Sequence, residues 1–86
     1  MNPLTRRQTD VLDTLIGGLA TRGFYPTPME IARQLGLKTA ESVRRHLTQL
    51  ESKGYIARDT RHRRLTVLRG LAGELVRVAV LLAEDE

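Results

Sequence analysis

A short turn constrains this chain more than any other feature. Gly36-Leu37-Lys38 separates residues 28–35 from residues 40–53, and in both segments apolar residues recur at helical spacing. Two helices joined by a turn of about three residues that contains glycine form a helix-turn-helix. We therefore predict this motif at the centre of the chain.

Start and stop signals support both helices. Thr27 is placed as an N-cap, Pro28 occupies the first helical position, and Glu30 completes a capping box. Thr39 is the N-cap of the second helix, and Gly54 ends it in the C′ position. The predicted buried stripes are Ile31, Ala32 and Leu35 in the first helix and Val43, Leu47 and Leu50 in the second.

An earlier helix precedes this motif. Thr5 and Gln8 form another capping box, and Gly23 is a stop after about residue 22. The apolar stripe between them is Val11, Leu12, Leu15, Ile16 and Leu19. Gly17 and Gly18 interrupt this helix at a cost of about 1 kcal/mol each relative to alanine. Close approach of another element is one possible reason for them.

Two β-prone runs follow the helices. Residues 55–58 and 65–68 flank the basic stretch 59–64, which predicts a hairpin with a basic tip. A helix, a helix-turn-helix and a two-stranded wing make a winged helix-turn-helix, mainly α with a small β-hairpin. Residues 1–69 are the predicted domain.

Charge is unevenly distributed along the 86 residues. Residues 38–69 hold nine Lys or Arg against three acidic residues, whereas the rest of the chain is mildly acidic and the whole carries +4. A basic segment of this kind favours a polyanion such as nucleic acid, although a solvated surface gives the same pattern. No apolar run is long enough for a membrane span and no signal peptide precedes the domain, so we expect a cytoplasmic protein without a membrane partner.

The exposed face of residues 40–53 carries side chains suited to base edges. Arginine pairs with guanine, glutamate accepts from cytosine, and hydroxyls are adaptable. The N-terminal part of the second helix enters the major groove in such motifs. The predicted reading residues are Thr39, Glu41, Ser42, Arg44, Arg45 and Thr48. The predicted wing and backbone contacts are Lys38, Arg61, His62, Arg63 and Arg64.

Three stretches carry a resemblance to a known family. "LTRRQTDVLDTLI", "PTPMEIARQLGL" and "SVRRHLTQLESKGYI" resemble the N-terminal DNA-binding domain of the LexA repressor family, over about residues 3–68. The resemblance implies a winged-helix transcriptional repressor, associated with the SOS response, that binds palindromic operators on double-stranded DNA as a homodimer.

The chain departs from the family in two respects. The positions matching Arg44 and Arg45 are typically acidic in the family and help to read the SOS operator, and Glu41 stands where asparagine is usual. This reversal of charge predicts a changed operator. The family's C-terminal domain cuts its own linker with a serine–lysine dyad. The only serines here are Ser42 and Ser52, both in a predicted helix, so we expect no self-cleavage.

The segment 70–86 is too apolar for a free linker. A 4-3-4 spacing predicts a C-terminal dimerisation helix with one interface ridge, Leu71, Leu75, Val78 and Leu82. Valines at 76, 78 and 80 permit a strand instead, and the segment could also pack onto its own domain.

Other functions have weaker support. His46 is predicted to be a partly buried packing residue and His62 a phosphate neighbour, because the two lack the spacing of a metal site. We predict no metal, cofactor, small-molecule ligand or enzymatic activity. The competing interpretation is a protein-interaction winged helix in which the C-terminal segment binds a partner protein.

Overall fold

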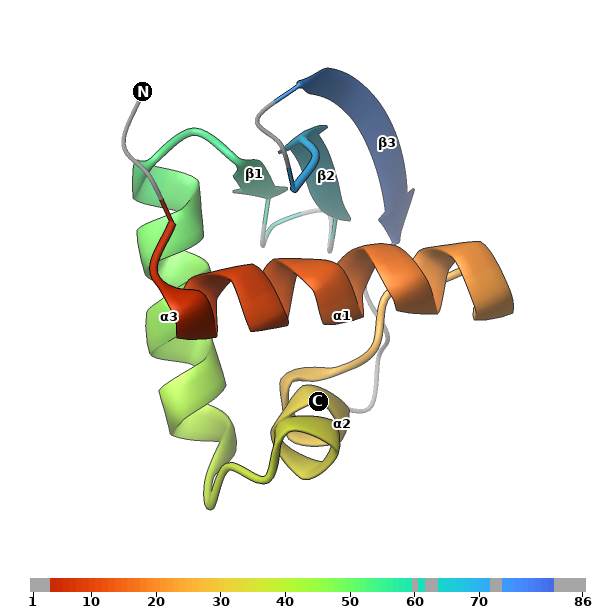
Figure 1. The fold of residues 1–86 in the computed structure, drawn as a ribbon. Coiled ribbons are helices and arrows are strands. Elements are labelled where there is room, and N and C mark those ends of the chain that lie inside the picture. Colours follow the sequence, from red (N-terminus) through yellow and green to blue (C-terminus); the bar gives the residue numbers. More distant parts are fainter. Residues whose placement is uncertain (1–3, 60, 62–63, 72–73, 82–86) are drawn as a thin grey trace.

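The computed structural model describes residues 4–59, 61, 64–71 and 74–81. Three helices come first, namely α1 (Arg6–Arg22), α2 (Pro28–Leu35) and α3 (Ala40–Ser52). In Figure 1 α2 lies below α1, and α3 crosses α1 near its N-terminal end. No helix in this part of the chain is both long and apolar enough to cross a membrane.

Both predicted capping boxes are confirmed. Thr5 Oγ1 accepts from the backbone N–H of Gln8 at 3.1 Å, and Gln8 Oε1 accepts from the backbone N–H of Thr5 at 3.0 Å. Thr27 and Glu30 make the same exchange at the start of α2, at 3.2 Å and 2.9 Å. These local bonds satisfy N–H groups that a helix start otherwise leaves without partners.

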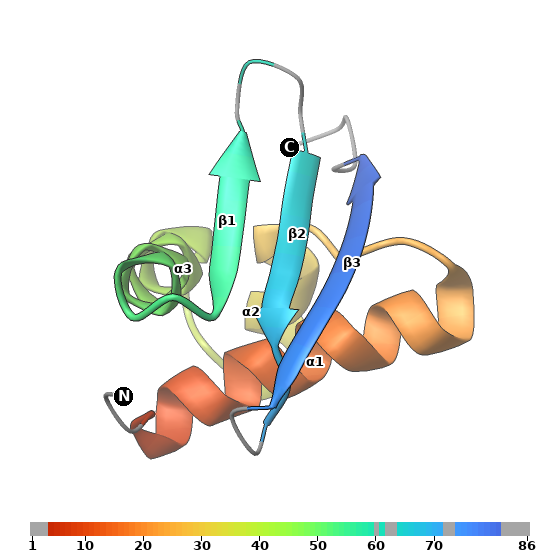
Figure 2. The same cartoon turned by 90° about the horizontal axis from the view of Figure 1, so that it is seen from above.

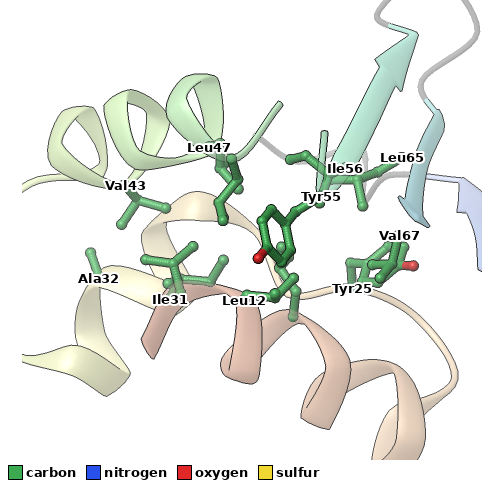
Figure 3. Packing of buried hydrophobic residues seen from close by; sticks show 13 residues of the cluster. Leu12, Tyr25, Ile31, Ala32, Val43, Leu47, Tyr55, Ile56, Leu65 and Val67 are labelled. Atoms are coloured by element: carbon green, nitrogen blue, oxygen red, sulfur yellow. The ribbon is translucent and has the colours of Figure 1, made fainter. Parts of the chain in front are cut away.

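The helices and the sheet enclose one hydrophobic core. Leu12 of α1, Ile31 of α2 and Leu47 of α3 converge with Leu65 and Val67 of the sheet (Figure 3). The apolar stripes predicted for α2 and α3 are buried at Ile31, Ala32, Val43, Leu47 and Leu50. Their burial fixes which face of α3 remains outside.

The predicted wing is present. β1 (Ile56–Asp59) pairs antiparallel with β2 (Arg64–Arg69), with Ile56 opposite Val67 and Arg58 opposite Leu65. Gly54, between α3 and β1, has a φ of 85°, which suits glycine at the C′ position of a helix. β1 lies beside α3 and runs away from α1 (Figure 2).

The predicted C-terminal helix is wrong. Leu75–Leu81 forms a strand, β3, which pairs antiparallel with β2 and gives a sheet of order β1-β2-β3. Alternating valines favour extended backbone, and the second edge of β2 supplies the hydrogen bonds that a strand needs. The strand that the valines permitted is therefore the observed form, and it packs onto its own domain.

The predicted dimer interface does not have the helical form that we expected, and its role in pairing two copies stays a prediction. Leu75 and Val78 lie in β3, Leu71 is exposed in the preceding turn, and Leu82 is outside the described residues. Leu75 and Val78 are therefore not aligned by helical spacing, because both lie in a strand.

A buried glutamine ties α1 to α3. Gln8 Nε2 donates to Gln49 Oε1 at 2.6 Å, and Gln8 Oε1 accepts from Lys53 Nζ at 2.6 Å. The same side chain completes the capping box of α1. It therefore holds the start of α1 against the C-terminal end of α3.

One of the two interior glycines of α1 has a packing reason. A Cβ atom at Gly18 would lie 2.5 Å from Pro26 Cδ, whereas one at Gly17 would meet nothing within 4 Å. The chain after α1 thus folds back against Gly18, which is the close approach that the sequence left open.

Candidate nucleic-acid interface

The polar face of α3 points away from the core. Its buried side is formed by Ala40, Val43, Leu47 and Leu50. On the other side Glu41, Arg44 and Arg45 are exposed. These three side chains therefore share the solvent-facing side of α3, with Arg44 at its flank.

The first turn of α3 organises its own polar side chains. Thr39 Oγ1 accepts from the backbone N–H of Ser42 at 3.3 Å and lies 3.5 Å from Ser42 Oγ. Thr39 is exposed and Ser42 half-buried. These two hydroxyls are fixed by the helix start and still face the surface on which Arg45 lies.

The Thr48 hydroxyl makes hydrogen bonds within the protein that the sequence did not indicate. Its hydroxyl donates to the carbonyl oxygen of Arg44 at 3.1 Å and accepts from Arg58 Nη2, also at 3.1 Å. These two interactions use the donor of the hydroxyl and one of its two acceptor lone pairs. Thr48 belongs to the exposed face, but its hydroxyl joins α3 to the wing.

Sequence reasoning missed Arg58 and Glu51. Arg58 in β1 forms an ion pair with Glu51 in the last turn of α3, at 3.2 Å between Nη2 and Oε1. The two residues belong to different elements, and no local pattern links them. Only the packing of β1 beside α3 brings them together.

The structure places only part of the predicted wing contacts. Arg61 is exposed in the turn between β1 and β2, and Lys38 is exposed in the turn before α3. The Arg64 backbone pairs with Asp59, but its side chain lies outside the described residues. His62 and Arg63 also lie outside them.

His46 is the partly buried packing residue that we predicted. Its Nδ1 atom is buried without a hydrogen-bond partner. Burial lowers the pKa of His46, and the positive charges of Arg45 and Arg7 lower it further, against a hydrogen bond with Gln49 that raises it. The neutral imidazole is therefore the form that suits this site.

The three helices, the hairpin wing and the exposed basic face of α3 define a winged helix-turn-helix DNA-binding domain. The family model described as the LexA DNA binding domain matches residues 1–65. The chain belongs to this family.

Full-length relatives agree over the same region. The chain is 41% identical over 69 residues to the LexA repressors of Bacillus mycoides and Bacillus anthracis, a match that covers 79% of this chain and 34% of each relative. The chain thus spans about a third of the length of these curated relatives.

Proposed function

We propose that the chain is a transcriptional repressor that binds double-stranded DNA with the N-terminal half of α3 in the major groove. The observation that carries this proposal is the exposed face of Thr39, Glu41 and Arg45, opposite the buried stripe of a helix-turn-helix. The named relatives are repressors, which supports the regulatory role.

The base preference follows from the charges. Exposed Arg44 and Arg45 suit guanine O6 and N7, and Glu41 suits the amino group of cytosine. We therefore propose an operator that offers guanine where an SOS box would present cytosine to an acidic side chain. Selection of binding sites from random duplexes, followed by competition against an SOS-type box, tests this. An SOS-type box that outcompetes every selected site would contradict it.

The wing supplies phosphate contacts in this proposal. Replacing Arg61, Arg63 and Arg64 by glutamine should weaken binding to all duplexes, because each lost phosphate contact reduces the slope of log K against log salt by about 0.9. Titrations at several salt concentrations measure the slope. The protein-interaction alternative instead expects no salt-dependent duplex binding by the unaltered chain.

We also propose that two copies bind a palindromic operator. One small winged helix buries too little surface for strong discrimination, and two copies related by a two-fold axis combine their contact energies. Among the described residues β3 is an edge strand in the sheet order β1-β2-β3, and an edge of this kind supports pairing with a second copy. Light scattering of the complex gives the stoichiometry. One copy per palindrome would refute this part.

Absence of self-cleavage stays a prediction of the same proposal. Mass spectrometry of the protein after prolonged incubation at alkaline pH checks it, and fragments from a single internal cut would contradict it.

A further inference from the structure

Glu51 accepts hydrogen bonds from Arg58 with both of its carboxylate oxygens. Oε2 accepts from the backbone N–H of Arg58 at 3.4 Å. Oε1 accepts from the side chain, at 3.2 Å from Nη2 and 3.4 Å from Nε. β1 is an edge strand, so the carboxylate also satisfies a backbone donor on the open side of the wing.

The same guanidinium reaches further along α3. Arg58 Nη2 donates to Thr48 Oγ1 at 3.1 Å, and the Thr48 hydroxyl donates to the Arg44 carbonyl oxygen. Arg58 thus joins two successive turns of α3 to the wing. Its side chain is only 22% exposed, which sets it apart from the exposed Arg45 and Arg61.

The link between Glu51 and Arg58 matters more for the position of β1 relative to α3 than for the free energy of unfolding. A partly exposed ion pair contributes little to the free energy of unfolding, because water screens the charges and ordering two long side chains costs entropy. The link instead joins α3, which would read bases, to β1, which leads to the wing. Discrimination requires base and phosphate contacts to fit one duplex at the same time.

We propose, on the basis of the DNA-binding function above, that Glu51 is a positioning residue for operator discrimination. It holds Arg58 against Thr48 and so sets the wing relative to α3. Loss of Glu51 lets the wing find phosphates on any duplex while α3 is misaligned.

A double-mutant cycle tests this role. The variants are Glu51→Ala, Arg58→Ala and the double variant, each titrated with the best selected duplex and with a scrambled duplex at the same salt concentration. Glu51→Ala should lower the ratio of the two affinities about threefold to tenfold, the coupling that contacting residues typically show. Affinity for the scrambled duplex should not fall, because an anion is removed.

Two features separate this role from simple repulsion of DNA by a carboxylate. In the Arg58→Ala background, Glu51→Ala should change the ratio much less, because only the bond to the backbone N–H of residue 58 is left to lose. Glu51→Gln should restore most of the ratio, since its amide oxygen still accepts from Arg58. Asp13→Ala is the charge-matched control, because Asp13 is exposed on α1 and has no part in the link.

An equal effect of Glu51→Ala with and without Arg58 would overturn the proposal. So would a uniform rise in affinity for both duplexes that Asp13→Ala reproduces. An unaltered protein that binds no duplex would overturn the DNA-binding function itself. An unaltered protein that discriminates, together with an additive cycle, would overturn only the role of Glu51.

Discussion

The two halves of α3 differ in what their polar side chains contact. In the N-terminal half, Thr39 and Ser42 interact with each other, and Arg45 faces solvent. In the C-terminal half, Gln49 is bonded to α1 and Glu51 to β1. The C-terminal half is therefore bonded to neighbouring elements, and we call it the anchored half. The N-terminal half faces solvent, and we call it the presented half.

This division suits a helix that reads DNA. Side chains in contact with base edges must be placed accurately while their hydrogen-bonding groups remain available. Anchoring the far end of the same helix meets both needs, because a helix transmits position along its backbone. The link between the C-terminal half and α1 is therefore expected to control stability, whereas the N-terminal half, positioned by the link between Glu51 and Arg58, is expected to control sequence preference.

The largest expected effect comes from breaking the anchored half. Gln8→Ala removes the bonds to Gln49, Lys53 and the backbone of Thr5. The loss of these three part-buried hydrogen bonds, at about 1 kcal/mol each, should lower the free energy of unfolding by about 3 kcal/mol. Urea denaturation measures the change.

Two further measurements make the test of Gln8→Ala more specific, namely the stability of a matched control variant and the base preference of Gln8→Ala itself. Gln34→Ala removes an exposed glutamine of α2 and should stay within about 0.5 kcal/mol. The base preference of folded Gln8→Ala protein should be unchanged. Equal costs for Gln8→Ala and Gln34→Ala would show that the link to α1 does not anchor α3.

The presented half should respond in the opposite way. Arg45→Ala should relax preference at one or two base pairs by about 1–3 kcal/mol, since one bidentate contact is lost. Its unfolding free energy should change by less than about 0.5 kcal/mol. Binding to a panel of duplexes with single base-pair changes measures the first quantity.

Arg33→Ala is the control for charge, because Arg33 is exposed on α2. It should leave the preference intact. If Arg45→Ala lowered affinity equally for all duplexes in the panel, the assignment of α3 to the major groove would be wrong.

A smaller difference in stability is expected between two glycines of α1, the helix that contains Gln8. Gly17→Ala should raise stability by up to about 1 kcal/mol, because the site is open and alanine favours helix. Gly18→Ala should lower it, because its Cβ would meet the rigid ring of Pro26 at 2.5 Å. Thermal unfolding of both variants measures these changes in stability. Melting temperatures that shift in the same direction would contradict the packing of Pro26 on α1.

Local signals explain why much of the fold was predictable. The capping boxes at Thr5 and Thr27 involve residues three apart, so the sequence alone specifies them. The buried stripe of α3 follows in the same way from helical spacing. Two glycines in α1 were visible in the sequence, but only tertiary packing distinguishes Gly18 from Gly17.

The structure differs from the sequence interpretation at two places, and contacts between distant segments of the chain explain both differences. Residues 75–81 fit a helix by apolar spacing, and the free edge of β2 made them a strand. Thr48 stays a predicted reading residue, but the sequence did not show that its hydroxyl also accepts from Arg58 of the wing. Neither outcome is encoded in a local pattern.

The smallest expected effect concerns His46, at the boundary between the two halves of α3. Protonation would place a positive charge beside Arg45 and Arg7, in a site where Nδ1 is buried without an acceptor. The pKa of His46 is therefore lower in the folded protein than its ordinary value of 6.5. Between these two pKa values the unfolded chain binds a proton that the folded chain does not.

It follows that the stability linked to His46 is fully present above a pH of about 6.5 and is lost as the pH falls through the lowered folded-state pKa. His46→Gln should flatten the dependence of the unfolding free energy on pH in this window, which urea denaturation at a series of pH values measures. Glu30 does not interfere, because its hydrogen bond with the Thr27 backbone holds its pKa below the ordinary value of 4.5. Arg45→Ala should narrow the window by raising its lower limit, since one of the charges opposing protonation in the folded protein is gone. If stability instead rose on acidification, His46 would have a stabilising partner in its charged form, and the boundary between the halves would be a third anchor.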